Sequence, residues 1–411
     1  MRTLTWGRSD EPLQARPRKV GFRIFADHPQ RMIGTQEKGS TSGVPQTPAG
    51  ERGPVYVTRA FLPPFDTFTE LMRGVWERGQ LTNNGPLVQQ FERALAEQAG
   101  IAHPLFLVNG TIALNLIIRA LELKGEVITT AFSHPVTTTS IIWEGCTPVF
   151  VDIDPDTFCI DPSAIEERIT PATSAILATH VYGLPCDVEA IEAIARRHGL
   201  KVIYDGAHAF GTRYKGESLL NFGDVSSTSF HATKVFHTVE GGSVHTRDEA
   251  LYARLRLLRT MGQVGEGFHA VGLNAKNSEL HAAMGVANLP FLDEILAQRR
   301  HQWERYATGL ASAPVHLARI PADTEYNHSY FPAVLPTEEA LLRVRAALNA
   351  VDIHPRRYFS PAVTELPFIG RTGECPIAES VAHRVLCLPL YHGLSDAIID
   401  EVVDIVSRTL R

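Results

Sequence analysis

The sequence has few of the features that mark specialised classes of protein, and each absence excludes one class. No apolar run is long enough to span a bilayer, and residues 1–20 lack the apolar stretch of a secretory signal. The formal net charge of -6 argues against non-specific binding to nucleic acid, which needs clustered lysine and arginine. No G-x-G-x-x-G motif follows the first expected strand, which disfavours a nicotinamide-dependent dehydrogenase.

Cysteine is scarce as well. The five cysteines are odd in number, scattered and free of C-x-x-C spacing: Cys146, Cys159, Cys186, Cys375 and Cys387. This pattern predicts neither a disulfide framework nor a zinc site, and it fits reduced thiols. We therefore expect a cytoplasmic protein without a metal ion.

Length and composition predict a soluble protein of several domains. The chain has 411 residues, of which 44% are hydrophobic, and a prior of about 150 residues per domain gives two or three domains. Residues 1–53 are rich in Gly, Ser, Thr and Pro towards their end and predict a flexible N-terminal extension. We expect a larger α/β domain over residues 54–290 and a smaller α+β domain over residues 291–411.

Short apolar runs alternate with helical patterns from about residue 85 onwards. The stretches EVITT, SAILATHVYG and LKVIYDGA predict strands, whereas GPLVQQFERALAEQAG and DVEAIEAIARRHG have apolar residues at helical spacing. Strand–helix alternation is typical of an α/β domain with a mostly parallel sheet. Such sheets bind ligands beyond the carboxyl ends of their strands, and the candidate motifs fall at those ends.

Two of these motifs have several interpretations. Asp205 ends the strand of VIYDGAHAFG, where a carboxylate can cap a helix, bind a metal or pair with a cationic ring nitrogen. Asn109, Gly110 and Thr111 form a turn that opens a helix, and the free N–H groups of a helix N-terminus suit a phosphate. By themselves the cap and the plain turn are the favoured interpretations.

Lys234 lies between two histidines in SFHATKVFHTVEGG, a weakly charged turn rich in Ser and Thr. Most lysines are surface residues, but a lysine with a lowered pKa can form a Schiff base with an aldehyde. A phosphate site, a strand-end aspartate and a later lysine are together what pyridoxal phosphate requires. The six-residue spacing of His231 and His237 suits no common metal motif, so a structural role and a substrate contact both stay open for them.

These pieces, in this order, resemble the DegT/DnrJ/EryC1/StrS family of sugar aminotransferases, which depend on pyridoxal phosphate. The resemblance covers about residues 55–405 and is closest to the branch that acts on nucleotide-linked 4-keto-6-deoxyhexoses. The matching stretches include LTNNGP, NGTIAL, VITTAFSHPVTT, PVFVDIDPDTFCIDP, HVYGLPCDVEAI, VIYDGAHAFG, SFHATKVFHTVEGG and LNAKNSELHAAMG. It implies the fold-type I architecture, in which a mostly parallel sheet of seven strands is followed by a smaller C-terminal domain.

The resemblance also assigns roles to residues. Lys234 matches the lysine that forms the Schiff base, Asp205 matches the partner of the pyridinium nitrogen, and His208 falls near the phenolic oxygen of the cofactor. His134 falls where the family has an aromatic ring stacked on the cofactor, and Asn274 matches a residue that reaches the phosphate of the neighbouring subunit in a homodimer. The phosphate contacts match Asn109, Gly110, Thr111 and Ser229.

The resemblance implies transfer of an amino group from glutamate to a nucleotide-linked keto sugar, with amination at C4 and with Lys234 moving the proton. Arg356 and Arg357, next to Tyr358, are candidates for the sugar nucleotide's diphosphate, and Tyr330 is a further candidate contact. Surface charge and core aromatics explain these residues equally well. No nucleic acid or membrane partner is expected.

Several alternatives remain at this stage. A 3-keto sugar or an aminocyclitol ketone would use the same fold and chemistry. A catalytically silent protein that binds pyridoxal phosphate would keep the motifs for regulation. Relatives that dehydrate their substrate have histidine in place of the lysine, and Lys234 argues against that branch.

Overall fold

The computed structural model describes residues 53–369 and 373–411. The predicted extension over residues 1–53 therefore lies outside the described residues, except for Gly53. Residues 53–411 group into one compact unit. The proposed division of that unit into domains over residues 54–290 and 291–411 stays a prediction.

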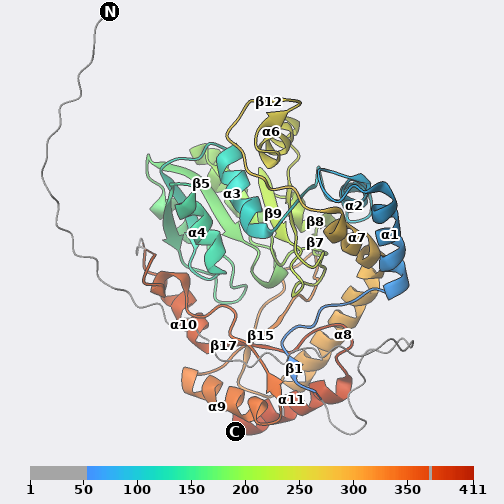
Figure 1. Ribbon diagram of the computed structural model, residues 1–411. Helices are drawn as coiled ribbons and strands as arrows, with labels where there is room; N and C mark the ends of the chain where they lie inside the picture. The colour runs from blue at the N-terminus through green and yellow to red at the C-terminus, as the bar shows by residue number, and fades with distance from the viewer. Residues whose placement is uncertain (1–52, 370–372) are drawn as a thin grey trace, which may run out of the picture. The chain divides into compact units, whose positions relative to one another are not determined.

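A seven-stranded sheet forms the centre of the described residues (Figure 1). Four neighbouring pairs, β9–β6, β6–β5, β5–β3 and β3–β4, are parallel, and β10 runs antiparallel to both β9 and β2. The sheet confirms the predicted α/β fold with a mostly parallel sheet. In sheet order the strands are β2 (Leu105–Leu107), β10 (Gly242–His245), β9 (Val225–Ser229), β6 (Lys201–Asp205), β5 (Thr173–Thr179), β3 (Glu126–Thr130) and β4 (Thr147–Val151).

Successive side chains of the central strands enter different cores, as the two-residue period of a strand requires. In β6, Ile203 packs on one face, whereas Val202 and Tyr204 pack on the other. The first face is covered by α3 (Gly110–Ala120), α4 (Pro135–Trp143) and α6 (Glu249–Arg259), and the second by α5 (Val188–His198) and α10 (Pro376–Arg384). Both faces are therefore buried, which explains the nearly continuous apolar runs of the strands.

A third layer consists of α1 (Phe65–Arg78), α2 (Pro86–Glu97) and α7 (Glu279–Asn288), which pack around Phe91, Phe106, Phe230 and Phe236. The buried carboxylate of Glu279 accepts hydrogen bonds from the Leu87 N–H at 3.0 Å and the Val88 N–H at 2.9 Å. It thereby caps the N-terminus of α2, where N–H groups have no partner within the helix. This contact fixes the 81–86 loop against α7.

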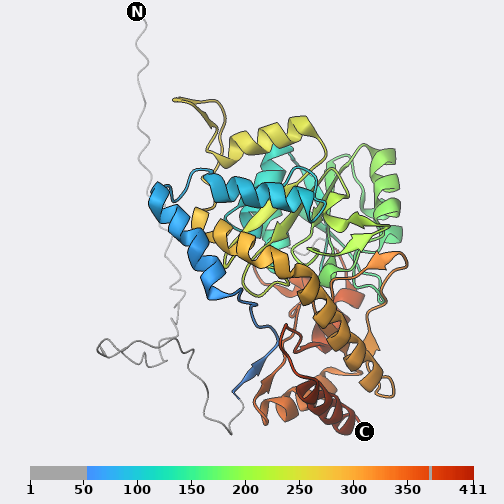
Figure 2. The ribbon, with the colours of Figure 1, turned by 90° about the vertical axis from the view of Figure 1, so that its right-hand side faces the viewer.

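The C-terminal elements form their own core. Helices α8 (Leu292–Gly309), α9 (Glu338–Asn349) and α11 (Asp396–Thr409) pack with the sheet of β13 (His316–Leu317), β15 (Phe331–Val334) and β17 (Val385–Leu388). The long helix α8 runs from the α7 layer to α11 (Figures 1 and 2). Strand β1 (Val55–Tyr56) pairs in parallel with β16 (Ile353–His354), so the start of the described chain joins these C-terminal elements.

Two small sheets complete the fold. Strand β7 (Arg213–Tyr214) lies between β8 (Glu217–Ser218) and β14 (Thr324–Glu325), and β11 (Gln263–Val264) forms a hairpin with β12 (Gly267–Phe268). Among the helices that the structure describes, none has both the length and the apolar character needed to cross a bilayer.

We predict that Glu279→Gln lowers the free energy of unfolding by about 1–3 kcal/mol, because the amide keeps only one acceptor for two buried N–H groups. Chemical denaturation followed by fluorescence measures the change. Glu192→Gln is the control: Glu192 forms an exposed ion pair with Arg196, and the loss of this pair should move the midpoint little. Equal midpoints for the two variants would contradict the capping role of Glu279.

Candidate active site

A cavity of about 460 Å³ lies at the carboxyl ends of the central strands. Thr179, Asp205 and Ser229 are the last residues of β5, β6 and β9, and all three line it. Eleven predicted site residues line the cavity together: Asn109, Gly110, Thr111, His134, Asp205, His208, Ser229, Lys234, Tyr330, Arg356 and Tyr358. Arg357 and Asn274 do not.

Asp205 is held in a fixed orientation. Its side chain is 5% exposed, its Oδ2 accepts a hydrogen bond of 2.7 Å from the Thr137 hydroxyl, and its Oδ1 accepts one of 3.0 Å from the Ala207 N–H. Thr137 is fully buried near the start of α4. Two separate segments therefore orient the carboxylate of Asp205, which lines the cavity. None of its described contacts caps a helix.

Lys234 lies on the loop between β9 and β10. Hydrogen bonds from the Phe230 N–H to the Gly241 carbonyl and from the Ala232 N–H to the Val239 carbonyl, each 2.8 Å long, close this loop. Burial lowers the pKa of the Lys234 amine to about 8, although the nearby Asp205 carboxylate raises it. An amine with such a pKa is far more often neutral near pH 8 than an ordinary lysine, as a nucleophile or a base requires.

The N-terminus of α3 forms a cradle with small residues. Asn109 caps the helix, since its side chain accepts a hydrogen bond of 2.8 Å from the Ile112 N–H. A side chain at Gly242 would place its Cβ 2.5 Å from the Asn109 carbonyl carbon, and one at Gly110 would lie 3.2 Å from the Ser229 Cβ. The start of α3 lines the cavity next to these closely packed segments, and the N–H groups of a helix start suit a phosphate.

His208 and His134 both line the cavity. Burial, together with Lys234 and His134, lowers the pKa of His208 well below its ordinary value, so the ring is neutral. The His208 Nδ1 is buried and has no hydrogen-bond partner in the described part of the chain. His134 caps α4 through its Nδ1, which accepts a hydrogen bond of 3.3 Å from the Val136 N–H. Partial burial and the nearby Lys234 ammonium lower the pKa of the His134 ring.

The structure separates the two histidines that flank Lys234. His237 is 2% exposed, its Nε2 lies 2.6 Å from the Phe61 carbonyl and its Nδ1 accepts from the Val239 N–H, so its role is structural. His231 lines the cavity, and its Nε2 lies 3.5 Å from a carboxylate oxygen of Glu240. The substrate-contact alternative therefore remains for His231 alone.

The C-terminal elements supply the remaining wall. Tyr330, Arg356, Tyr358 and Phe359 line the cavity, and the Arg356 guanidinium lies 4.9 Å from the centre of the Tyr358 ring. Arg357 turns away: its Nη2 donates to a Glu338 carboxylate oxygen at 3.0 Å and to the carbonyls of Ala382 and His383. Of the two arginines, only Arg356 is in place to meet a ligand here.

Asn274 is exposed, and its Oδ1 accepts a hydrogen bond of 2.7 Å from the Lys276 ammonium. Its predicted role in a neighbouring subunit stays a prediction. Two further residues near the site are fixed by their local surroundings. A Cβ at Gly206 would lie 2.4 Å from Leu220 Cδ2, and the Asn277 amide donates to the Leu107 carbonyl at 3.0 Å.

Sequence reasoning did not identify the cavity residues Phe359, Thr179, Thr233 and Glu240, nor Thr137, which lies behind the cavity wall and holds Asp205. Thr137 and Glu240 stand inside stretches that carry the resemblance, so their position within these stretches was the available signal. Phe359 directly follows Tyr358 and gave no signal of its own. Among residues 53–369 and 373–411, no group of three or more potential metal ligands occurs.

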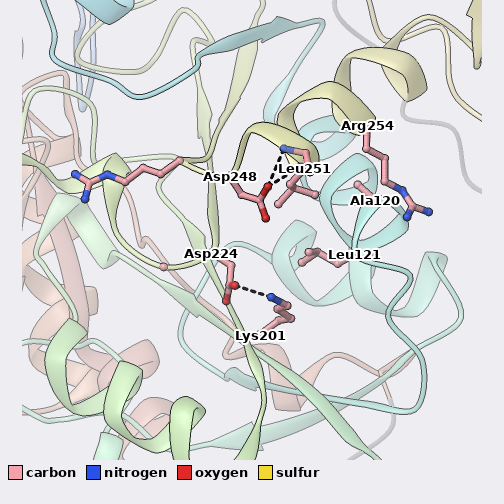
Figure 3. Close-up of a pocket in the computed structure, with 10 residues that line it drawn as sticks. Ala120, Leu121, Lys201, Asp224, Asp248, Leu251 and Arg254 are labelled. Atoms are coloured by element: carbon pink, nitrogen blue, oxygen red, sulfur yellow. Dashed lines mark hydrogen bonds and ion pairs between the residues drawn. The ribbon is translucent and has the colours of Figure 1, made fainter.

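A second cavity, of about 470 Å³, lies at the opposite edge of the sheet (Figure 3). Lys201 begins β6 there and pairs with Asp224 at 2.8 Å, and Asp248 accepts from N–H groups at the start of α6. Arg247 and Arg254 are paired with Glu217 and Glu122. Because these cations and the helix start already have partners, this cavity offers no ready binding site.

Comparisons with known proteins agree with this geometry. The model of the DegT/DnrJ/EryC1/StrS aminotransferase family matches residues 66–407. A dTDP-4-amino-4,6-dideoxy-D-glucose transaminase of Shigella dysenteriae is 40% identical over 360 residues, which make up 86% of this chain and 98% of the relative. A GDP-perosamine synthase of Caulobacter vibrioides is 34% identical over 355 residues, or 84% of this chain and 95% of the relative.

Among solved structures, DesI in the presence of its TDP-sugar product is similar with a TM-score of 0.82 and 35% identity. The similarity covers 89% of this chain and 95% of DesI. The resemblance inferred from the sequence motifs is thereby confirmed.

We predict that Lys234, in protein freed of any cofactor, reaches half-maximal acylation near pH 8. Asp205→Asn should move this midpoint to lower pH, because the carboxylate raises the pKa of the amine and its removal lets the proton leave earlier. Competitive labelling across pH with peptide mass spectrometry measures both midpoints, with the exposed Lys124 as internal reference. An unchanged midpoint in Asp205→Asn would contradict the coupling of the two groups.

Proposed function

The chain belongs to the DegT/DnrJ/EryC1/StrS aminotransferase family, and we propose that it uses pyridoxal 5′-phosphate to transfer an amino group from glutamate to a nucleotide-linked 4-keto-6-deoxyhexose. The amine would form at C4 of the sugar. One observation carries the proposal: the cavity is lined by a lysine with a lowered pKa, a buried carboxylate and the first residues of α3, Gly110 and Thr111. The names of the Shigella dysenteriae relative and of DesI's bound product favour a dTDP-linked sugar.

The residues of the cavity fit the three parts of the cofactor. The N–H groups at the start of α3, with Thr111 and Ser229, would hold the phosphate, and Asp205 would pair with the ring nitrogen. The unpartnered Nδ1 of the neutral His208 offers a hydrogen bond to the ring's phenolic oxygen. When bound, pyridoxal phosphate supplies an aldehyde that takes up the amino group and a ring that withdraws electrons from the reacting carbon.

The chain's own groups then hold and move protons. Asp205, oriented by Thr137, keeps a proton on the ring nitrogen, since a buried carboxylate favours a charged partner. With a pKa of about 8, roughly a tenth of Lys234 amines would be neutral at pH 7, far more than for an ordinary lysine. The Lys234 Nζ can therefore take a proton from the donor's α-carbon and return one to the sugar's C4 as general base and acid.

Arg356 would bind the substrate's anionic group. Arg356 lines the cavity, and its guanidinium contacts the Tyr358 ring. The main chain of Arg356 forms hydrogen bonds with the main chain of Cys387. A planar guanidinium can bind a diphosphate through two parallel hydrogen bonds. Tyr330, Tyr358 and Phe359 provide ring faces for the uncharged part of the substrate.

We further propose that the protein acts as a homodimer in the cytoplasm. Asn274 is exposed and does not line the cavity of its own chain, which suits a contact with the phosphate of a second copy. Leu62, Phe65, Trp76 and Leu81 are large apolar side chains that are 71%, 76%, 69% and 48% exposed, and a second copy would cover them. Cys146, Cys159, Cys186 and Cys387 are buried thiols that form no disulfide, as in a reducing compartment.

The decisive assay incubates the purified protein with glutamate and a panel of dTDP- and GDP-linked 4-keto sugars and one 3-keto sugar. We expect an amino sugar from a 4-keto substrate, detected by mass spectrometry, and no turnover by Lys234→Ala. Asp205→Ala should be slower by several orders of magnitude, because the ring loses its proton. Amination of only the 3-keto sugar would overturn the substrate, and transamination by Lys234→Ala would overturn the mechanism.

The adjacent arginines give a matched pair of variants. Arg356→Ala should raise the KM for the sugar nucleotide about tenfold to a hundredfold, because a charge-assisted hydrogen-bond pair is lost. Arg357→Ala should leave that KM nearly unchanged and lower the melting temperature, since its guanidinium joins Glu338 to the end of α10. Steady-state kinetics and thermal denaturation measure both, and the reverse pattern would assign the diphosphate to Arg357.

A further inference from the structure

Asn327 is a fully buried polar residue whose hydrogen-bonding groups are all used. Its Nδ2 donates to the His208 carbonyl at 2.6 Å and to the Phe210 carbonyl at 2.8 Å, and its Oδ1 accepts from the Ser329 N–H at 3.0 Å. The two carbonyls can only accept and the N–H can only donate, so an amide is the one side chain of this size that satisfies all three. Asn327 thereby ties the segment before β15 to the loop that follows Asp205.

The segment that carries Asn327 is itself fixed. The buried Arg299 of α8 donates from its Nε to the His328 carbonyl at 3.0 Å and from its Nη2 to the Ser329 carbonyl at 2.6 Å. The Tyr326 hydroxyl donates to the Tyr182 carbonyl at 2.9 Å. Asn327 is therefore anchored to a rigid part of the fold and does not move freely with the loop that it binds.

The junction between Asn327, Gly183 and the His208 main chain is closely packed. Gly183 has a φ of +87°, and a Cβ at this position would lie 2.5 Å from the His208 carbonyl oxygen and 2.7 Å from the Asn327 Oδ1. The Thr212 hydroxyl accepts from the Asn327 N–H at 3.3 Å and donates to the Gly183 carbonyl at 3.0 Å. The main chain at His208 is thus confined from two sides, by Gly183 and by the Asn327 amide.

The confined residue is one that faces the reaction. The His208 ring lies parallel to the Phe359 ring with centroids 5.7 Å apart, and it meets the Tyr330 ring edge-on at 4.9 Å. Tyr330 stands on the same fixed segment, three residues after Asn327. One buried amide therefore sets the separation between His208 on the sheet side and Tyr330 on the C-terminal side of the cavity.

We propose that Asn327 is a positioning residue of the transamination: by holding the His208 main chain, it places the unpartnered His208 Nδ1 where it contacts the bound cofactor. The inference rests on the proposed function and goes beyond it, because Asn327 does not itself line the cavity. Its effect passes through His208.

The test measures the bound cofactor as well as activity. In Asn327→Ala, two buried carbonyls lose their donor and the His208 loop is free to shift. The apparent pKa of the cofactor's visible absorption band should move by about one pH unit, and kcat should fall about tenfold, because a hydrogen bond near the ring is misplaced. The KM for the sugar nucleotide should change less than about twofold, because Arg356, the proposed ligand of the diphosphate, is untouched.

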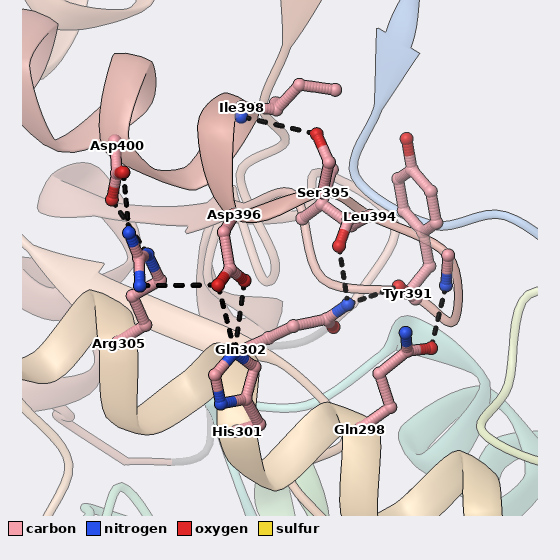
Figure 4. Close-up of polar contacts among 11 residues, drawn as sticks. Gln298, His301, Gln302, Arg305, Tyr391, Leu394, Ser395, Asp396, Ile398 and Asp400 are labelled. Carbon is pink, nitrogen blue, oxygen red and sulfur yellow. Dashed lines mark hydrogen bonds and ion pairs between the residues drawn. The ribbon is translucent and has the colours of Figure 1, made fainter.

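Gln302 provides a matched control (Figure 4). It is fully buried on α8, and its Nε2 likewise donates to two main-chain carbonyls, those of Tyr391 and Leu394, each at 3.0 Å. These contacts join α8 to the loop before α11, away from the cavity. Gln302→Ala should lower the melting temperature about as much as Asn327→Ala, yet leave the absorption band and kcat unchanged.

A double-mutant cycle tests whether Asn327 acts through His208. In a His208→Gln background, Asn327→Ala should reduce kcat much less than it does in the wild type. An equal reduction in both backgrounds would overturn the proposal, and so would an Asn327→Ala enzyme that loses stability like Gln302→Ala but keeps the wild-type band and kcat. If Asn327→Ala does not fold, Thr212→Val, which loosens the same junction, replaces it and is judged by the same criteria. A wild-type protein that binds no cofactor would overturn the proposed function itself.

Discussion

The balance of burial and charge at Lys234 is the constraint on which the site depends. Burial lowers the pKa of the amine to about 8, and the carboxylate of Asp205 limits the fall. That carboxylate stays in place because the Thr137 hydroxyl and the Ala207 N–H hold both of its oxygens. Since Asp205 ends β6 and Ser229 ends β9, the register of two neighbouring strands sets where the lysine loop begins relative to the carboxylate.

The sheet side of the site could be predicted because its signals are local. A strand that ends in Asp205, a turn with Asn109 before a helix and a lysine in a tight loop each follow from a few neighbouring residues, and parallel strands bring their carboxyl ends to one edge. The alternation of apolar strands and amphipathic helices predicted the sheet itself in the same way. Thr137, the hydrogen-bond partner of Asp205, could not be predicted in this way. It lies 68 positions away in the sequence, and no pattern in its neighbouring residues indicates what its hydroxyl binds.

The C-terminal wall was less predictable for a geometric reason. Arg356 and Arg357 look equivalent in the sequence, but neighbouring residues of an extended segment point to opposite sides. The Arg356 main chain pairs with Cys387 of β17; the Arg356 side chain lines the cavity, and the Arg357 side chain contacts Glu338. This alternation does not distinguish the roles of His231 and His237. The contact of the His237 Nε2 with the Phe61 carbonyl does, because it gives His237 a structural role.

The pairing of β1 with β16 bears on how the chain is made. Val55 is synthesised before all seven strands of the central sheet, and its partner Ile353 follows only after them. Contacts between residues so far apart form late, because the intervening chain must first be ordered. During synthesis the first strand must therefore wait, and the wall that carries Arg356 and Tyr358 can close over the cavity only after all strands of the central sheet have been made.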